Sequence, residues 1–459
     1  MTGVSSLYLL RNLRVNIIYS FDHHLEAHSV IKERFVWMIY MAIFFFLLYG
    51  AANQYAGLTA PHASLWMEWE KKIPFIEAFI VPYMSSDLMF VVAFFFPYSR
   101  VELRVLSARI LFIISVATIV FIVFPLQFSF TKPSVENFNF LFSILEADLP
   151  FNQLPSLHIA FAIVLWYSMR KHFQNRWLKV FTALWLWLIA LSTLFVYQHH
   201  FIDLPTGALL GLLSVYAVGE KKESLLSHSF TTPRSLKMAL YYIGASVLMM
   251  ILAFVVPSVF SWLFLWLFIS LLMVSVIYAF GLNTLLAGKE ANPSWWQWLV
   301  FAPYFVGNYL SWQYYKRKLP LMKVLKDNVY LGRYPSSMEY KELQKQGIGL
   351  ALNLAMEQQI QKKGLPQIRL PYLDQTIQSP ESLHKGVLYI EEYKTKGVYV
   401  HCTLGLSRSV LLASAWLIFK GYSIEEAQSE IAKVRPNYVK SPYMEITLNM
   451  YSEYLKGLN

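Results

Sequence analysis

The only cysteine of this 459-residue chain lies between a β-branched segment and an apolar one. Residues 397–412 read GVYVHCTLGLSRSVLL, so Cys402 is followed, after five residues, by Arg408. A loop between a strand and a helix N-terminus can wrap a phosphate with backbone N–H groups, and this setting favours a thiolate. Arg408 can bind two phosphoryl oxygens, and Gly405 permits a tight loop. The spacing predicts a phosphate-binding loop with Cys402 as nucleophile.

The segment HCTLGLSRS resembles the signature of the cysteine-dependent phosphatases. VYLGRYPSS at 329–337 is similar to the opening strand of the dual-specificity subgroup, and VRPN at 434–437 is similar to its Arg-Pro element. The resemblance covers about residues 319–455. It implies an α/β domain that cleaves phosphomonoesters through a phosphocysteine.

The resemblance also implies an aspartic acid on a separate loop that protonates the leaving oxygen. Asp374 lies 28 residues before Cys402 and suits this role; its alternative reading is a surface turn or a helix cap. Ser409 would assist release of the thiolate. The loop carries Leu404 and Leu406 and no lysine, which favours phosphotyrosine or a simple lipid phosphomonoester over highly phosphorylated inositol lipids.

Two histidine segments occur at the ends of neighbouring apolar stretches. LPSLH contains Ser156 and His158, and HHFID contains His199, His200 and Asp203. A short loop joins the two stretches on one side of a membrane. Both histidine segments therefore lie on the other side. Ionisable groups there are costly and usually functional. We expect His199 to attack phosphorus, Asp203 to orient its ring and His158 to protonate the leaving group; only His199 has the His-x3-Asp spacing.

These residues resemble the type 2 phosphatidic acid phosphatase superfamily over about 75–218, which implies its six-helix core. The resemblance makes Ser156 a substrate-binding residue. Thr193 stands where the family has a phosphate-binding arginine, and the family's first motif is reduced to Lys132-Pro133, with Pro125 in place of its leading lysine. Lys132 is then the expected phosphate-binding cation. The HHFIDL run is similar to the branch of inositol-phosphoceramide and sphingomyelin synthases, so a transferase remains an alternative.

Composition indicates a polytopic membrane protein, because 56% of residues are apolar and only 15% charged. The expected spans are 35–52, 75–97, 106–127, 155–173, 178–198, 201–218, 238–256 and 258–280. The stretch 295–312 either crosses or lies at the interface. Loops 98–109, 170–179 and 219–237 are richest in Lys and Arg and are expected in the cytoplasm.

We expect an all-α membrane domain followed by an α/β phosphatase domain, with strands near 329–332, 349–354 and 397–401. The predicted segments are a cytoplasmic N-terminal segment (1–34), the phosphatidic acid phosphatase-like domain (35–218), a linker (219–237), additional membrane helices (238–312) and the phosphatase domain (319–459).

The sequence as a whole resembles bacterial inner-membrane proteins that fuse these two modules. It predicts a bifunctional phosphatase acting on bilayer lipid phosphates, of the phosphatidate, phosphatidylglycerol phosphate or isoprenoid phosphate class, with phosphoproteins as another substrate class. No metal, cofactor or nucleic-acid partner is expected. The histidine site is expected outside the cytoplasm and the Cys402 domain inside it. The alternatives are a lipid headgroup phosphotransferase with a regulatory phosphatase domain, and a catalytically dead membrane scaffold.

Overall fold

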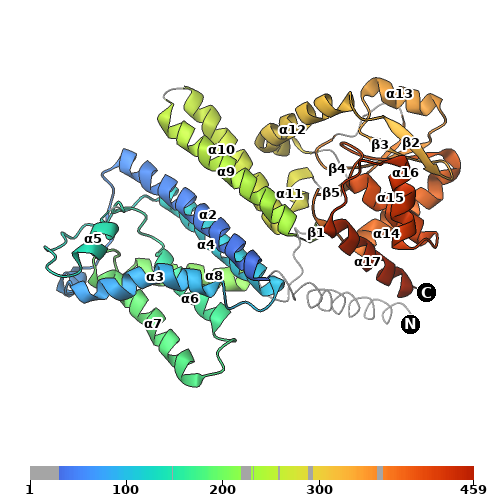
Figure 1. Ribbon diagram of the computed structural model, residues 1–459. Helices are drawn as coiled ribbons and strands as arrows, with labels where there is room; N and C mark the ends of the chain where they lie inside the picture. The colour runs from blue at the N-terminus through green and yellow to red at the C-terminus, as the bar shows by residue number, and fades with distance from the viewer. Residues whose placement is uncertain are drawn as a thin grey trace, which may run out of the picture. The chain divides into compact units, whose positions relative to one another are not determined.

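The computed structural model describes residues 30–146, 148–218, 229–230, 232–256, 259–287, 293–358 and 365–458. These residues form two compact units, 1–223 and 224–459 (Figure 1). Most of the predicted N-terminal segment and of the 219–237 linker lies outside the described residues.

The first unit consists of helices. They are α2 (Val30–Thr59), α3 (Ile80–Ala93), α4 (Arg100–Val123), α5 (Asn139–Leu145), α6 (Leu157–Met169), α7 (Arg176–Phe195) and α8 (Asp203–Ala217), with short 3-10 turns η1 (Glu68–Lys72) and η2 (Glu77–Phe79). Helix α6 packs against α3, α4, α7 and α8. It is therefore the central element of this unit.

A close approach of α6 and α8 fixes the two histidine segments relative to each other. A Cβ atom on Gly207 would lie 2.4 Å from the carbonyl oxygen of Ser156, so only glycine fits there. The backbone N–H of Ser156 also donates to the carbonyl oxygen of Asp203 at 3.1 Å. The starts of the two helices are thus joined directly.

Five helices, α2, α4, α7 and the second-unit helices α9 and α10, are long and apolar enough to cross a membrane, and they indicate a multi-pass integral membrane protein. The expected spans at 75–97, 155–173 and 201–218 correspond to the shorter helices α3, α6 and α8. Helix α6 has 13 residues and α8 has 15, which is about 20 Å of helix each at 1.5 Å per residue. Both begin within the histidine motifs: Ser156 directly precedes α6, which contains His158, and Asp203 is the first residue of α8.

The second unit begins with a helical hairpin of α9 (Pro233–Val255) and α10 (Val259–Phe280), followed by α11 (Asn283–Ala287) and α12 (Trp295–Lys316) (Figure 1). Helix α12 covers the ambiguous 295–312 stretch and contains Pro303. It is not among the five long apolar helices. Its Trp312 is buried in one hydrophobic cluster with Tyr334 and Tyr340 of the C-terminal α/β domain, so the end of α12 packs against that domain.

The C-terminal α/β domain is built on a five-stranded sheet in the order β2-β3-β7-β4-β5. The strands are β2 (Met322–Lys326), β3 (Val329–Arg333), β4 (Leu350–Ala355), β5 (Gln367–Tyr372) and β7 (Val398–Cys402). Strand β2 is antiparallel to β3, and the other neighbours are parallel. The central strand β7 pairs along its length with β3, and Cys402 lies opposite Arg333.

Five helices belong to this domain: α13 (Ser337–Lys345), α14 (Pro380–Tyr393), α15 (Arg408–Phe419), α16 (Ile424–Val434) and α17 (Pro442–Lys456). Helix α15 is buried along nearly all its length and packs against α14, α16 and α17. The predicted α/β architecture and its three expected strands are confirmed; β2 and β5 were not expected. The capping box of Ser423 and Glu426 is present at the start of α16.

Two candidate phosphoryl-transfer sites

The Cys402 loop joins the end of β7 to the start of α15, as its sequence predicts. Gly405 has φ +74°, and a Cβ there would lie 2.4 Å from the carbonyl oxygen of Gly332. The loop is therefore pressed against strand β3, and only glycine fits at its tip. Helix α15 begins at Arg408 with its N-terminus toward the loop, where its dipole favours an anion.

The environment of Cys402 stabilises a thiolate. Burial by itself would raise the pKa of the thiol, but the positive charge of Arg408 and hydrogen bonds from Ser409 outweigh it, so the pKa of Cys402 is lowered. Sγ accepts a hydrogen bond from the backbone N–H of Gly405 at 3.2 Å, and Ser409 Oγ lies 3.5 Å away. The loop thus supplies the conditions that a cysteine nucleophile needs.

A buried glutamate holds the arginine of the loop. Arg408 donates from Nη1 to Glu357 Oε2 at 2.8 Å and from Nη2 to Oε1 at 2.5 Å. Nε of Arg408 is buried and makes no hydrogen bond within the described structure. Burial opposes ionisation of Glu357, but the positive charge of Arg408 outweighs this effect, so the pKa of Glu357 is lowered. The pair orients the guanidinium and leaves Nε available for a phosphoryl oxygen.

Asp374 lies at the same loop, although it is 28 residues earlier in the chain. Its Oδ1 accepts a hydrogen bond from Ser407 Oγ at 3.1 Å and lies 3.7 Å from Nε of Arg408. Ser407 is in turn hydrogen-bonded to Tyr443 at the start of α17. The carboxylate is about one-third exposed. A phosphate bound on Arg408 would therefore have Asp374 beside it, which is the placement required of a general acid.

Sequence reasoning missed Glu357 and Tyr443. A signal existed for Glu357: it follows β4, the parallel neighbour of the strand that ends at Cys402. Carboxyl ends of neighbouring parallel strands meet at one edge, where α/β proteins build their sites. No such signal exists for Tyr443, which reaches the loop through the packing of α17. Arg435 of the VRPN element donates a hydrogen bond to the carbonyl oxygen of Leu331 at 2.9 Å. It therefore binds strand β3.

The histidine site of the first unit brings its predicted residues together. His199 Nδ1 lies 3.2 Å from Asp203 Oδ2, and the ring centroids of His158 and His199 are 5.8 Å apart. The His158 ring also packs on Tyr83, with centroids 4.5 Å apart. With Nδ1 engaged by the carboxylate, Nε2 of His199 is the nitrogen available to attack phosphorus. The three predicted residues therefore lie together, and the phosphohistidine mechanism assigned to them stays a prediction.

The remaining residues that the sequence analysis considered for this site are Ser156, Thr193 and Lys132, and each has its own surroundings. Ser156 is fully buried, and its Oγ makes no hydrogen bond within the described structure. Thr193 turns its hydroxyl to the carbonyl oxygen of Ala190 in its own helix, so it does not replace the family's arginine. Lys132 is exposed and close enough to Asp148 to interact electrostatically with it.

His200, which follows the predicted nucleophile His199, contacts a different carboxylate, that of Glu70. Its Nδ1 lies 3.1 Å from Glu70 Oε2, and both side chains are buried. The backbone N–H of Phe201 donates to the same carboxylate oxygen at 3.0 Å. Glu70 therefore fixes the turn between His199 and Asp203. A carboxylate pairing of this kind, 130 residues away in sequence, could not be read from the chain.

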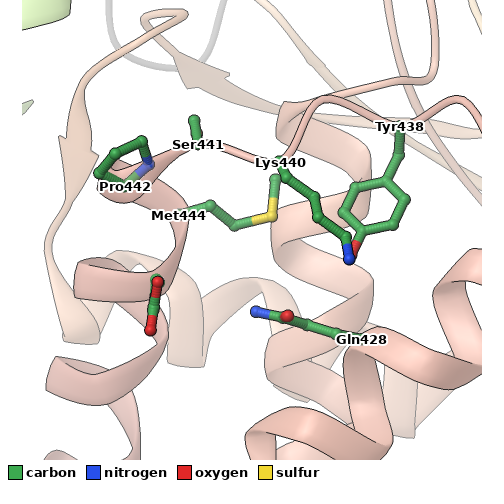
Figure 2. A pocket seen from close by; sticks show the side chains of 7 residues that line it. Gln428, Tyr438, Lys440, Ser441, Pro442 and Met444 are labelled. Atoms are coloured by element: carbon green, nitrogen blue, oxygen red, sulfur yellow. The ribbon is translucent and has the colours of Figure 1, made fainter.

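A shallow surface pocket occurs elsewhere in the phosphatase domain. Figure 2 shows Tyr438 and Lys440 above Gln428 of α16, with Met444 of α17 closing one side. None of the predicted site residues lines it. Its lining therefore does not include the Cys402 loop, and the histidine site belongs to the other unit.

Comparison with known families agrees with the two sites. The family model described as "Dual specificity phosphatase, catalytic domain" matches residues 329–453, and the model "PAP2 superfamily" matches residues 107–226. The chain thus carries two phosphatase domains. The first is a PAP2-superfamily domain within the helical region, and the second is a C-terminal dual-specificity phosphatase domain.

The phosphatase domain is similar to mammalian proteins named "Phosphatidylglycerophosphatase and protein-tyrosine phosphatase 1". The mouse protein is 37% identical over 97 residues, 20% of this chain and 50% of the relative. The human protein is 42% identical over 82 residues, 17% of this chain and 41% of the relative. The chain thus spans about half the length of the curated relatives it matches, or less.

Solved structures match the same region. "Tk-PTP in the active form" is 27% identical with a TM-score of 0.28, covering 29% of this chain and 97% of that one. "PTPMT1 in complex with PI(5)P" is 25% identical with a TM-score of 0.29, covering 30% of this chain and 99% of that one.

Proposed function

We propose that the Cys402 site hydrolyses phosphomonoesters of membrane lipids. The observation that carries this proposal is the arrangement of Arg408: Glu357 holds its two terminal nitrogens, and its buried Nε lies 3.7 Å from Asp374 Oδ1. Cys402 Sγ attacks phosphorus while Asp374 gives its proton to the departing alkoxide. Water, deprotonated by Asp374, then attacks the phosphocysteine and releases inorganic phosphate and the thiolate, which Ser409 stabilises.

The substrate class follows from the loop and from the relatives. Leu404 and Leu406 give the loop no charge of its own to bind additional phosphates. The name of the mammalian relatives makes phosphatidylglycerol phosphate the first lipid to test and phosphotyrosine the second. Attachment to a helical hairpin supports the lipid, since the hairpin holds the domain at the bilayer where such substrates reside.

The His199 site is proposed to transfer phosphoryl groups independently, through a phosphohistidine. His199 and Asp203 form the attacking pair, and His158 is placed to protonate the leaving oxygen. Thr193 supplies no cation, so few positive charges hold the phosphate. A headgroup transferase, in which a lipid alcohol replaces water, therefore stays as the second candidate. The scaffold alternative predicts that no lipid phosphate is turned over here.

A panel of lipid phosphates separates these proposals. The full chain in nanodiscs is given phosphatidylglycerol phosphate, phosphatidate or an isoprenoid phosphate, and phosphate release is measured for wild type, Cys402→Ser and His199→Ala. We expect phosphatidylglycerol phosphate hydrolysis to depend on Cys402. Release from every lipid at the wild-type rate in Cys402→Ser would exclude the proposed Cys402 function. Transfer to an added lipid alcohol, lost in His199→Ala, would favour the transferase.

We further propose that the protein lies in a bacterial inner membrane, with the phosphatase domain on the cytoplasmic side. Thr232, directly before α9, hydrogen-bonds to this domain, and the expected loop 219–237 around it carries Lys221, Lys222, Arg234 and Lys237. Such loops are retained inside. The domain is therefore attached to the predicted cytoplasmic end of the hairpin.

Single introduced thiols test this orientation in a Cys402→Ser background. Met338 on α13 is 82% exposed and Phe140 on α5 is 75% exposed; the loop around Phe140 is expected outside. An impermeant maleimide should label Phe140→Cys in intact cells, and Met338→Cys only after permeabilisation. Labelling of Met338→Cys in intact cells would place the phosphatase domain outside.

A further inference from the structure

The acid loop, residues 371–378 around Asp374, is hydrogen-bonded to segments that flank the helical hairpin. β1 (Ser229–Phe230) pairs antiparallel with β6 (Ile377–Gln378). Thr232 Oγ1 donates to the carbonyl oxygen of Gln375 at 2.8 Å. The bond from Thr232 thus holds the residue after Asp374, and the pairing with β1 begins two residues further on, at Ile377. These contacts lie within the second unit and join the hairpin to the Cys402 site.

A third contact holds the other side of the acid loop. Asn283, the first residue of α11 after the hairpin, has its Nδ2 3.5 Å from the carbonyl oxygen of Pro371. Asn283 and Thr232 are both almost fully buried. Asp374 therefore lies between two attachments, one from the residues before α9 and one from those after α10.

The hairpin helices themselves are close to the site. Tyr242 of α9 and Tyr278 of α10 stack with ring centroids 5.6 Å apart. Both phenols are near enough to Asp374 and Glu357 for these carboxylates to oppose their ionisation. The two carboxylates of the Cys402 site thus lie within electrostatic range of a tyrosine on each hairpin helix.

The acid loop needs such support because of its local structure. Gln375 adopts φ +64°, which is rare for a residue with a side chain. Asp374 itself is attached to the phosphate loop by Ser407. Loops are generally the most mobile part of a domain, and a displacement of about 1 Å in a catalytic group can cost about 100-fold in rate.

We propose that Thr232 is a positioning residue for Asp374 and that the hairpin is part of the Cys402 catalytic unit. The proposal rests on the acid role of Asp374 proposed above. The hydroxyl of Thr232 fixes the carbonyl group of Gln375, the residue after Asp374, and so the distance from the carboxyl proton to the leaving oxygen. Acid catalysis by the soluble domain then depends on a residue at the end of a membrane helix.

The test uses the full chain in nanodiscs and two substrates that differ in leaving group. An aryl phosphate with a good leaving group needs little protonation, whereas an alkyl phosphate needs it strongly. Thr232→Val should lower kcat about tenfold for the alkyl phosphate and change the aryl reaction less than twofold, with KM unchanged. Thr232→Ser keeps the donor and should restore wild-type kcat for both.

Ser235→Ala is the matched control, because Ser235 Oγ accepts a hydrogen bond from the backbone N–H of Thr232 at 2.9 Å and completes the capping box of α9. This variant weakens the cap without touching the bond to Gln375 and should keep the wild-type ratio of alkyl to aryl rates. If Thr232→Val disrupts folding, Thr232→Asp, which can still cap the helix but cannot donate to a carbonyl, provides the same comparison.

An equal loss for both substrates, or the same loss in Ser235→Ala, would show a merely structural role and overturn the inference. Asp374→Asn separates this failure from that of the proposed function. If Asp374→Asn shows no preference for the better leaving group, the acid role itself is wrong. If it shows that preference and Thr232→Val does not, only the positioning role of Thr232 is wrong.

Discussion

Arg408 and Glu357 form a two-point ion pair inside the phosphatase domain, with N–O distances of 2.8 Å and 2.5 Å. Glu357 also accepts a hydrogen bond from Thr403 of the phosphate loop. The carboxylate therefore connects the arginine at the end of the loop to the side chain of Thr403 at its start. This explains how a fully charged guanidinium can stay buried at a site that is empty of phosphate for part of each turnover.

Removing the charge of Glu357 should disturb both stability and catalysis. Glu357→Gln leaves the buried Arg408 without its counter-charge, which costs about 3 kcal/mol in comparable pairs. We expect a lower thermal midpoint and a raised KM. The control is Glu339→Gln, which breaks the more exposed pair with Arg333 and should leave KM unchanged. Equal effects of the two variants on KM would contradict this role of Glu357.

The lowered pKa of Cys402 gives a pH prediction. A group with a depressed pKa is ionised at lower pH, so alkylation by iodoacetamide should rise with a midpoint below that of an ordinary thiol. Arg408→Ala removes the charge that opposes burial and should move the midpoint upward. Mass spectrometry of the alkylated chain against pH measures both. A wild-type midpoint at or above the ordinary value would be inconsistent with thiolate stabilisation.

Gly405→Ala should abolish most activity because the new Cβ would meet the carbonyl oxygen of Gly332. Moving the loop by about 1 Å is expected to lower kcat/KM about 100-fold. Gly421 provides the control: it also has positive φ, at +95°, but open space around it. Gly421→Ala should lose stability and keep kcat/KM. Comparable losses of kcat/KM in both variants would mean that backbone strain, not loop position, is responsible.

The two sites should be separable by mutation. In a Cys402→Ser background, His199→Ala should remove the remaining lipid-phosphate turnover, since no nucleophile is left. His158→Ala should slow poor leaving groups more than good ones, because its role is to supply a proton. Phosphate release from an alkyl and an aryl substrate measures this. An unchanged residual rate in both histidine variants would support the scaffold alternative.

The sequence predicted those features that depend on contiguous residues. The 402–408 loop, the strand before it and the helix after it are set by local spacing, and the His199–Asp203 pair by four residues of separation. The expected spans 155–173 and 201–218 were longer than α6 and α8, which run from Leu157 to Met169 and from Asp203 to Ala217. The contacts of Glu357, Glu70 and Thr232 were missed because each partner lies at least 46 residues away.

Trapping of the phosphoenzyme tests the central claim most directly. The full chain, as Asp374→Asn to slow breakdown, is mixed with phosphatidylglycerol phosphate labelled on its terminal phosphate and quenched within milliseconds. Mass spectrometry then locates the phosphorylated residue. We predict a thiophosphate ester on Cys402 that is absent in Asp374→Asn/Cys402→Ser and present in Asp374→Asn/His199→Ala. Phosphate release without label on Cys402, or label only on His199, would contradict the account.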